Sequence, residues 1–232
     1  MPMGRSNDTR PDFSRAATNN CLELTTLLTF AVVVGLGAVK IILVLSRRWN
    51  VPARHVDVPN AYVKADQEKN LDIYMKIPSG MQVAQEALDY QEVADKRQLA
   101  FFLKKSLYGL KQAERLWSKL LQSKLTELNF RQCTMDMCLN VNRTDTSVTV
   151  VGVHVDDLMV TGTSSDVVGR LFKDVGSLEI KDLEIVNKFV GLRVKVDDSE
   201  GYVLDQEVTI DLLLKKHGLD IANGVRSPIG NE

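Results

Sequence analysis

Residues 148–163 constrain the fold most, because they place two adjacent acids between two runs of β-branched residues. The stretch reads Val-Thr-Val-Val-Gly-Val-His-Val-Asp-Asp-Leu-Met-Val-Thr-Gly-Thr. Valine and threonine favour strands, whereas aspartate favours turns. The stretch therefore predicts a β-hairpin with Asp156 and Asp157 at its tip. Two neighbouring carboxylates held by buried strands repel each other unless a cation or a basic group offsets their charge.

Most isolated Asp-Asp pairs are solvated turn residues, so a functional interpretation needs a third acid. A short strand is predicted over His55–Val58 and carries Asp57, and Pro59 ends it. If this strand pairs with the hairpin, Asp57 and Asp156 lie on neighbouring strands. Three carboxylates at the ends of adjacent strands can hold two Mg²⁺ ions about 4 Å apart, which stabilise both the attacking and the leaving oxygens in phosphoryl transfer.

The remaining pattern mixes strands and helices without strict alternation, which predicts an α+β fold with an antiparallel sheet covered by helices. At 232 residues, with 44% hydrophobic and 25% charged residues, the chain can bury a substantial core. Further helices are expected over residues 104–128, Ser165–Asp174 and Val208–His217, and a second hairpin over Lys188–Val196 and Gly201–Leu204.

The segment 27–45 is almost wholly apolar and allows two interpretations. Its length suits a membrane-spanning helix that anchors the protein, with Arg47 and Arg48 on the cytoplasmic side. Lys40 argues against this, because a lysine at the centre of a span costs about 2.5–3.5 kcal/mol. A buried helix of a globular domain is the alternative. The odd count of three cysteines favours a reducing, intracellular compartment, cytoplasmic or nuclear.

The stretch from Lys96 to Arg131 has a local excess of basic residues. It contains nine lysines and arginines but only two glutamates. Because the whole chain has a net charge of −1, its positive field is concentrated here. Such a surface would hold a nucleic-acid backbone without reading its sequence. The alternative is a solvated helix face.

Several motifs in the expected order resemble the reverse transcriptases of copia-type retrotransposons. They are Asp57-Val58-Pro59-Asn60-Ala61-Tyr62-Val63, Asp72-Ile73-Tyr74-Met75, Leu103 through Ala113 followed by Arg115 and Trp117, Val155-Asp156-Asp157, Lys181-Asp182-Leu183 and Phe189-Val190-Gly191. The helix expected at Phe30–Ser46 is also similar to that family's helix before the first motif, which weakens the membrane interpretation. The resemblance covers about Phe30 to Pro228.

The resemblance implies the palm and partial fingers of a right-hand polymerase over residues 22–228, truncated at its N-terminal fingers, followed by a tail at 229–232. The polar composition of residues 1–21, without an apolar period, separately predicts a disordered lead-in. Asp57, Asp156 and Asp157 would bind two Mg²⁺ or Mn²⁺ ions, with Asp57 and Asp156 the more critical pair. Lys181 would protonate pyrophosphate.

The same resemblance implies where the substrates bind. The backbone of Val58, Pro59, Asn60 and Ala61 would lie along the incoming deoxynucleoside triphosphate, Tyr62 would reject a ribose 2′-OH by its bulk, and Tyr108 and Gly109 would pack near the templating base. Lys104, Lys105, Lys111 and Arg115 would contact an RNA or DNA template with its primer, whose end Phe189 and Gly191 would grip.

The sequence also departs from the family pattern. His154 replaces the usual tyrosine before Val-Asp-Asp, and Glu114 stands where the family has proline. We find no match in Met1–Asn20 for the basic fingers residues that contact the triphosphate, and no RNase H or integrase segment. We therefore expect a fragment or degenerate copy of a larger polyprotein. An inactive relic that binds nucleic acid is the alternative to an active RNA-directed DNA polymerase.

Overall fold

The computed structural model describes residues 33–197 and 201–223, which fall into two compact units. One unit contains the described residues 60–121, and the other contains residues 33–59 together with those from 122 onward. Each is a mixture of helices and antiparallel strands, as the α+β prediction requires. The expected lead-in at 1–21 and tail at 229–232 lie outside the described residues.

The larger unit is built on a six-stranded antiparallel sheet with the order β4-β5-β6-β7-β1-β8. Its strands are β1 (Arg54–Asp57), β4 (Arg131–Gln132), β5 (Leu139–Arg143), β6 (Val148–His154), β7 (Asp157–Gly162) and β8 (Lys181–Ile185). The predicted hairpin is therefore confirmed as β6 and β7. The predicted pairing of the Asp57 strand with that hairpin is confirmed as well, because β1 lies next to β7. Strands β4 and β5 were not predicted.

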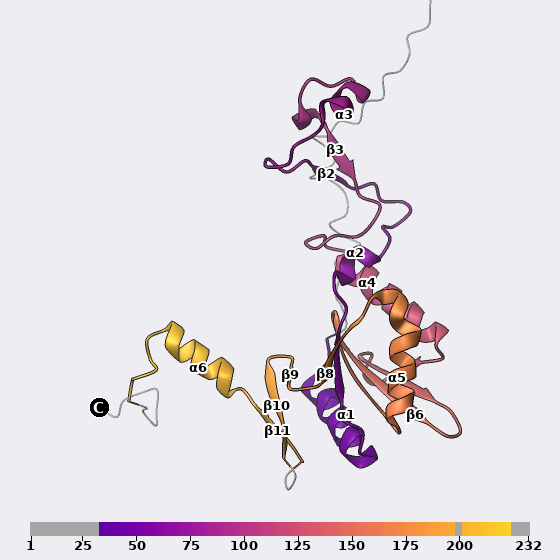
Figure 1. Cartoon of the computed structure of the whole chain (residues 1–232), viewed down its shortest axis with the longest axis vertical. Helices are drawn as coiled ribbons and strands as arrows, with labels where there is room; N and C mark the ends of the chain where they lie inside the picture. Colours follow the sequence, from indigo (N-terminus) through magenta and orange to yellow (C-terminus); the bar gives the residue numbers. More distant parts are fainter. Residues whose placement is uncertain (1–32, 198–200, 224–232) are drawn as a thin grey trace, which may run out of the picture. The chain divides into compact units, whose positions relative to one another are not determined.

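Two helices cover opposite faces of the β6–β7 hairpin (Figure 1). Helix α1 (Leu36–Trp49) packs on the face that carries Gly152, where a Cβ atom would lie 2.5 Å from Ile42 Cδ1. Helix α5 (Ser165–Asp174) packs on the other face, where a Cβ on Gly162 would lie 2.8 Å from Val167 Cγ2. The two glycines thus allow both helices to approach the sheet closely.

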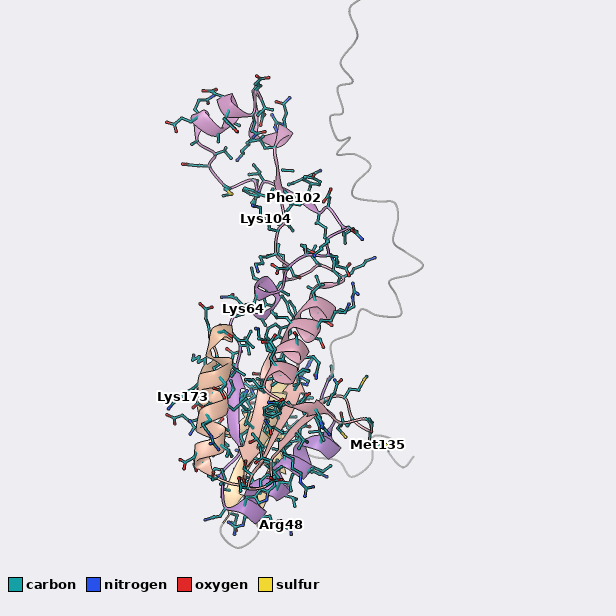
Figure 2. All side chains as sticks on the ribbon, turned by 90° about the vertical axis from the view of Figure 1, so that its right-hand side faces the viewer. Arg48, Lys64, Phe102, Lys104, Met135 and Lys173 are labelled. Carbon is teal, nitrogen blue, oxygen red and sulfur yellow. The ribbon has the colours of Figure 1, made fainter. Side chains whose placement is uncertain are left out.

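Helix α1 accounts for the described part of the apolar segment. Its buried side is formed by Ala38, Val39, Ile42, Leu43 and Ser46, and Lys40 lies on the exposed side. Arg47 and Arg48 lie in its last turn, where basic residues interact favourably with the helix dipole (Figure 2 labels Arg48). In the described ranges, which begin after residue 32, no helix is both long and apolar enough to cross a membrane.

A three-stranded sheet, β11-β10-β9, adds to the core beside α1. It consists of β9 (Lys188–Phe189), β10 (Leu192–Asp197) and β11 (Gly201–Asp205), which confirms the predicted second hairpin. Helix α6 (Glu207–Lys216) follows it and has no buried residue. Arg193 pairs with Asp205 at 2.8 Å and with Glu207, which ties the start of α6 to β10. A 3₁₀ turn, η2 (Val175–Leu178), continues α5.

The smaller unit contains a two-stranded sheet and short helices. Its elements are α2 (Ala61–Lys64), β2 (Tyr74–Lys76), α3 (Gln85–Tyr90), the 3₁₀ turn η1 (Lys96–Gln98) and β3 (Ala100–Phe102). Tyr74 and Phe102 face each other across β2 and β3, with ring centroids 5.5 Å apart. Helix α4 (Ala113–Glu127) contains the boundary between the units, after Leu121.

Candidate active site

The site is organised around Asp57, the last residue of β1. Asp57 is the direct partner of Asp157 in the β1–β7 ladder and of Lys181 in the β1–β8 ladder. Side chains of directly paired residues emerge on the same face of a sheet, about 4.5–5.5 Å apart at Cβ. Two carboxylates and one ammonium group are therefore aligned across three strands.

A β-bulge sets the pairing of Asp57 with Lys181. Arg54 pairs with Ile185, but Val56 pairs with Asp182, so the register shifts by one residue between them. Without this shift Asp57 would face Asp182, another acid. The bulge instead brings lysine beside Asp57 and leaves Asp182 to bind the guanidinium of Arg54. Bulges commonly re-aim side chains next to functional sites.

Asp156 lies in the two-residue turn of the hairpin, after Val155, which has a φ of +59°. A β-branched residue rarely adopts this conformation, so the turn stores strain beside the acids. The Asp156 carbonyl oxygen accepts a 3.1 Å hydrogen bond from the Val58 backbone N–H, which extends the contact between β1 and the hairpin beyond the ladder. Burial, with the nearby charges of Asp157 and Asp57, raises the pKa of Asp156.

The carboxylates of Asp57, Asp156 and Asp157 are oxygen ligands of the type that divalent cations such as Mg²⁺ prefer. All three carboxylates are half-buried, and the negative charges of Asp57 and Asp157 lie close enough to Asp156 to contribute to its raised pKa. A hard cation that prefers oxygen ligands would relieve that repulsion. Among the described residues, however, no three His, Cys, Asp or Glu side chains lie close enough together to hold a metal ion.

His55 contacts one of the three carboxylates. Its Nε2 atom lies 2.8 Å from Asp157 Oδ1, and its ring meets the Phe189 ring edge-on with centroids 5.4 Å apart. His154 also packs on Phe189, with centroids 6.1 Å apart, and its buried Nδ1 atom has no hydrogen-bond partner among the described residues. Sequence reasoning missed His55, although it lies two residues before Asp57 and so on the same face of β1.

The residues predicted to bind nucleotide are divided between the units. Val58 and Pro59 end the β1 segment of the larger unit, and the Val58 side chain is fully buried. In the smaller unit, Asn60 has a φ of +55° and Ala61 begins α2. The Tyr62 and Tyr108 rings pack together there, with centroids 4.4 Å apart. Gly109 follows with a φ of +90°, a conformation that favours glycine.

The basic residues predicted to contact nucleic acid also lie in the smaller unit. Lys104, labelled in Figure 2, and Lys111 are exposed and form no ion pair with any described residue. Lys105 instead pairs with Asp66 at 2.6 Å, and Arg115 pairs with Glu68. Two of the four cations are thus available to a phosphate backbone, and two already have acidic partners.

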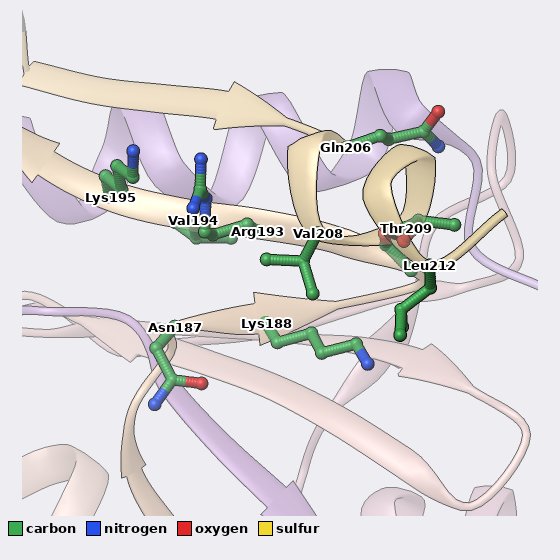
Figure 3. Close-up of a pocket in the computed structure, with 10 residues that line it drawn as sticks. Asn187, Lys188, Arg193, Val194, Lys195, Gln206, Val208, Thr209 and Leu212 are labelled. Carbon is green, nitrogen blue, oxygen red and sulfur yellow. Dashed lines mark hydrogen bonds between the residues drawn. The ribbon is translucent and has the colours of Figure 1, made fainter. Parts of the chain in front are cut away.

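The segment predicted to grip a primer contains one buried residue, Phe189, and one accessible residue, Gly191. The Phe189 side chain is 2% exposed in the core, so it is not accessible to nucleic acid in this structure. Gly191 lies in the turn after β9 and lines a hollow of about 380 Å³ between β9, β10 and α6. Figure 3 shows Lys188 on one side of this hollow, with Val208 and Leu212 of α6 on the other. The backbone at Gly191 and the Lys188 ammonium remain accessible for contact.

Acidic side chains at the ends of neighbouring strands can supply the oxygen ligands that divalent cations prefer. The chain belongs to the reverse transcriptase (RNA-dependent DNA polymerase) family, because that family's model matches residues 13–231.

Curated relatives agree with this assignment. The chain is similar to the retrovirus-related Pol polyprotein from transposon TNT 1-94 of Nicotiana tabacum, with 28% identity over 86% of the chain and 14% of the relative. It is also 28% identical to the Pol polyprotein from transposon RE1 of Arabidopsis thaliana, over 81% of the chain and 12% of the relative. The chain thus spans only a small part of these relatives' length. No solved structure matches it.

Proposed function

We propose that this chain is the RNA-directed DNA polymerase domain of a copia-type retrotransposon. It would add deoxynucleotides to the 3′-OH of a primer paired with an RNA or DNA template, using two Mg²⁺ or Mn²⁺ ions. The six-stranded unit would be the palm, and residues 60–121 would belong to the fingers. The observation that carries the proposal is the direct pairing of Asp57 with Asp157, beside Asp156 in the hairpin turn.

Asp57, Asp156 and Asp157 would hold the ions. When bound, such ions lower the pKa of the attacking 3′-OH and neutralise charge on the leaving pyrophosphate. The cross-strand position of Lys181 beside Asp57 supports a role for its ammonium group as the proton donor to pyrophosphate. The bulge in β8 is what makes this residue, rather than Asp182, the neighbour of Asp57.

The family motifs support the roles of the remaining residues. The backbone of residues 58–61 would contact the triphosphate, Tyr62 would exclude the ribose 2′-OH, and Tyr108 and Gly109 would bind next to the templating base. Lys104 and Lys111 would contact template or primer phosphates, since their ammonium groups are exposed and free of ion pairs with the described residues.

Primer extension on a poly(rA)–oligo(dT) template with Mg²⁺ or Mn²⁺ tests this function. Asp156→Asn removes one ligand charge at nearly constant volume, so we expect it to abolish extension while leaving the fold intact. Asp145→Asn is the matched control, because Asp145 is exposed in the turn between β5 and β6, at the far end of the hairpin. Equal extension by both variants would defeat the catalytic assignment.

The second candidate function is that of a relic that binds nucleic acid without catalysis. It is favoured by Lys104 and Lys111, which are exposed and form no ion pair with a described residue. In that case the wild-type chain binds the template–primer but does not extend it with either cation. Lys104→Ala and Lys111→Ala should then weaken binding and lower its dependence on salt.

A further inference from the structure

Among the described residues, the carboxylate of Asp157 is bound by another side chain, whereas no side-chain hydrogen bond or ion pair is seen for the carboxylates of Asp57 and Asp156. His55 Nε2 lies 2.8 Å from Asp157 Oδ1. A carboxylate oxygen accepts hydrogen bonds, so this contact is a hydrogen bond in the tautomer that carries the His55 proton on Nε2. Among the described residues, neither Asp57 nor Asp156 forms an ion pair. The three acids are therefore not equivalent.

The His55 ring is held in place by the core. It lies edge-on to Phe189, at an interplanar angle of 86°, and Phe189 is itself 2% exposed. The His55 side chain is 15% exposed and the Asp157 side chain is 36% exposed, so the bond is shielded from competing water mainly on the histidine side. Charge-assisted hydrogen bonds in such surroundings are stronger than exposed ones. A fixed ring thus restrains the carboxylate that it binds.

We propose that His55 is a positioning residue that holds the Asp157 carboxylate away from Asp57 and Asp156. These two acids are then left to take the first divalent cation, and Asp157 remains as a restrained neighbour. This inference rests on the proposed function only in assigning the three acids to one cation site. The hydrogen bond itself follows from the 2.8 Å distance between His55 Nε2 and Asp157 Oδ1.

Two substitutions separate positioning from packing. His55→Leu removes the donor but keeps an apolar side chain against Phe189, whereas His55→Gln keeps an N–H donor. With Mn²⁺ alone as the probe, in the full chain and without nucleic acid, we expect electron paramagnetic resonance to show about tenfold tighter binding for His55→Leu, because Asp157 is released to join the site. His55→Gln should retain wild-type affinity. In an Asp157→Asn background, His55→Leu should have no effect.

A second readout needs neither metal nor activity. In the ¹⁵N spectrum of the histidine rings, His55 should carry its proton on Nε2, and this signal should move on Asp157→Asn but not on Asp145→Asn. An unmoved signal, or equal Mn²⁺ affinity for the wild type and a folded His55→Leu, would overturn the proposal. If primer extension is absent throughout while both effects are present, the positioning role stands and the polymerase assignment fails.

Discussion

Asp57 and Asp157 are direct partners across the β1–β7 ladder, and Asp156 precedes Asp157 in the turn of the hairpin. Like charges placed directly opposite each other destabilise a sheet. A fold optimised for stability alone would not gather three acids at the ends of neighbouring strands. This repulsion is the expected cost of a cation site.

Asp156→Asn should stabilise the metal-free chain at neutral pH. Burial and the charges of Asp157 and Asp57 raise the pKa of Asp156. A raised pKa means that the protonated form favours folding and that this stability is lost as the pH rises through the folded-state pKa. Removing the charge should therefore raise Tm at pH 7 by a few degrees, on the order of 2–4 °C, in the presence of a chelator.

The pH dependence supplies the control for that result. Below about pH 3, where the carboxyl is protonated in both states, the difference in Tm between wild type and Asp156→Asn should disappear. A difference that stays constant from about pH 3 to pH 7 would show that the charge of Asp156 is not its cause.

Tyr62→Ala should admit ribonucleotides wherever extension is observed, because the bulk that excludes the 2′-OH is removed. Tyr108→Ala is the matched control, since it breaks the same ring contact at 4.4 Å from the other side. Competition between dTTP and UTP on a poly(rA) template measures the selectivity. Unchanged selectivity in Tyr62→Ala, or the same loss in Tyr108→Ala, would remove Tyr62 from the gate.

The contact between α1 and the sheet should show coupled stability. A Cβ on Gly152 would lie 2.5 Å from Ile42 Cδ1, the atom that valine lacks. We expect Gly152→Ala to cost about 1–3 kcal/mol and Ile42→Val about 0.5–1.5 kcal/mol of unfolding free energy. The double variant should lose less than the sum by about 0.5–2 kcal/mol. Strict additivity in urea denaturation would contradict this packing.

The β6–β7 hairpin and the neighbouring strand β1 could be predicted because the strand preference of valine and the turn preference of aspartate and proline indicate the same boundaries. The run of valines fixed strands on both sides of Asp156, and Pro59 limited the strand of Asp57. Period-2 alternation could also have identified His55. The bulge that pairs Asp57 with Lys181 could not be predicted, since it depends on how β8 is held across the sheet. Likewise, the family resemblance implied that Phe189 contacts the primer, but only tertiary packing shows that its side chain is buried.

The cation site is the central claim, and thermal unfolding tests it most directly. A ligand that binds only the folded state raises Tm as its concentration exceeds Kd. We expect millimolar Mg²⁺ or Mn²⁺ to raise the Tm of the chelator-treated wild-type chain, and to have little effect on Asp57→Asn or Asp156→Asn. Asp145→Asn should respond as the wild type does. Equal shifts in all four proteins would contradict the assignment of these acids to a metal site.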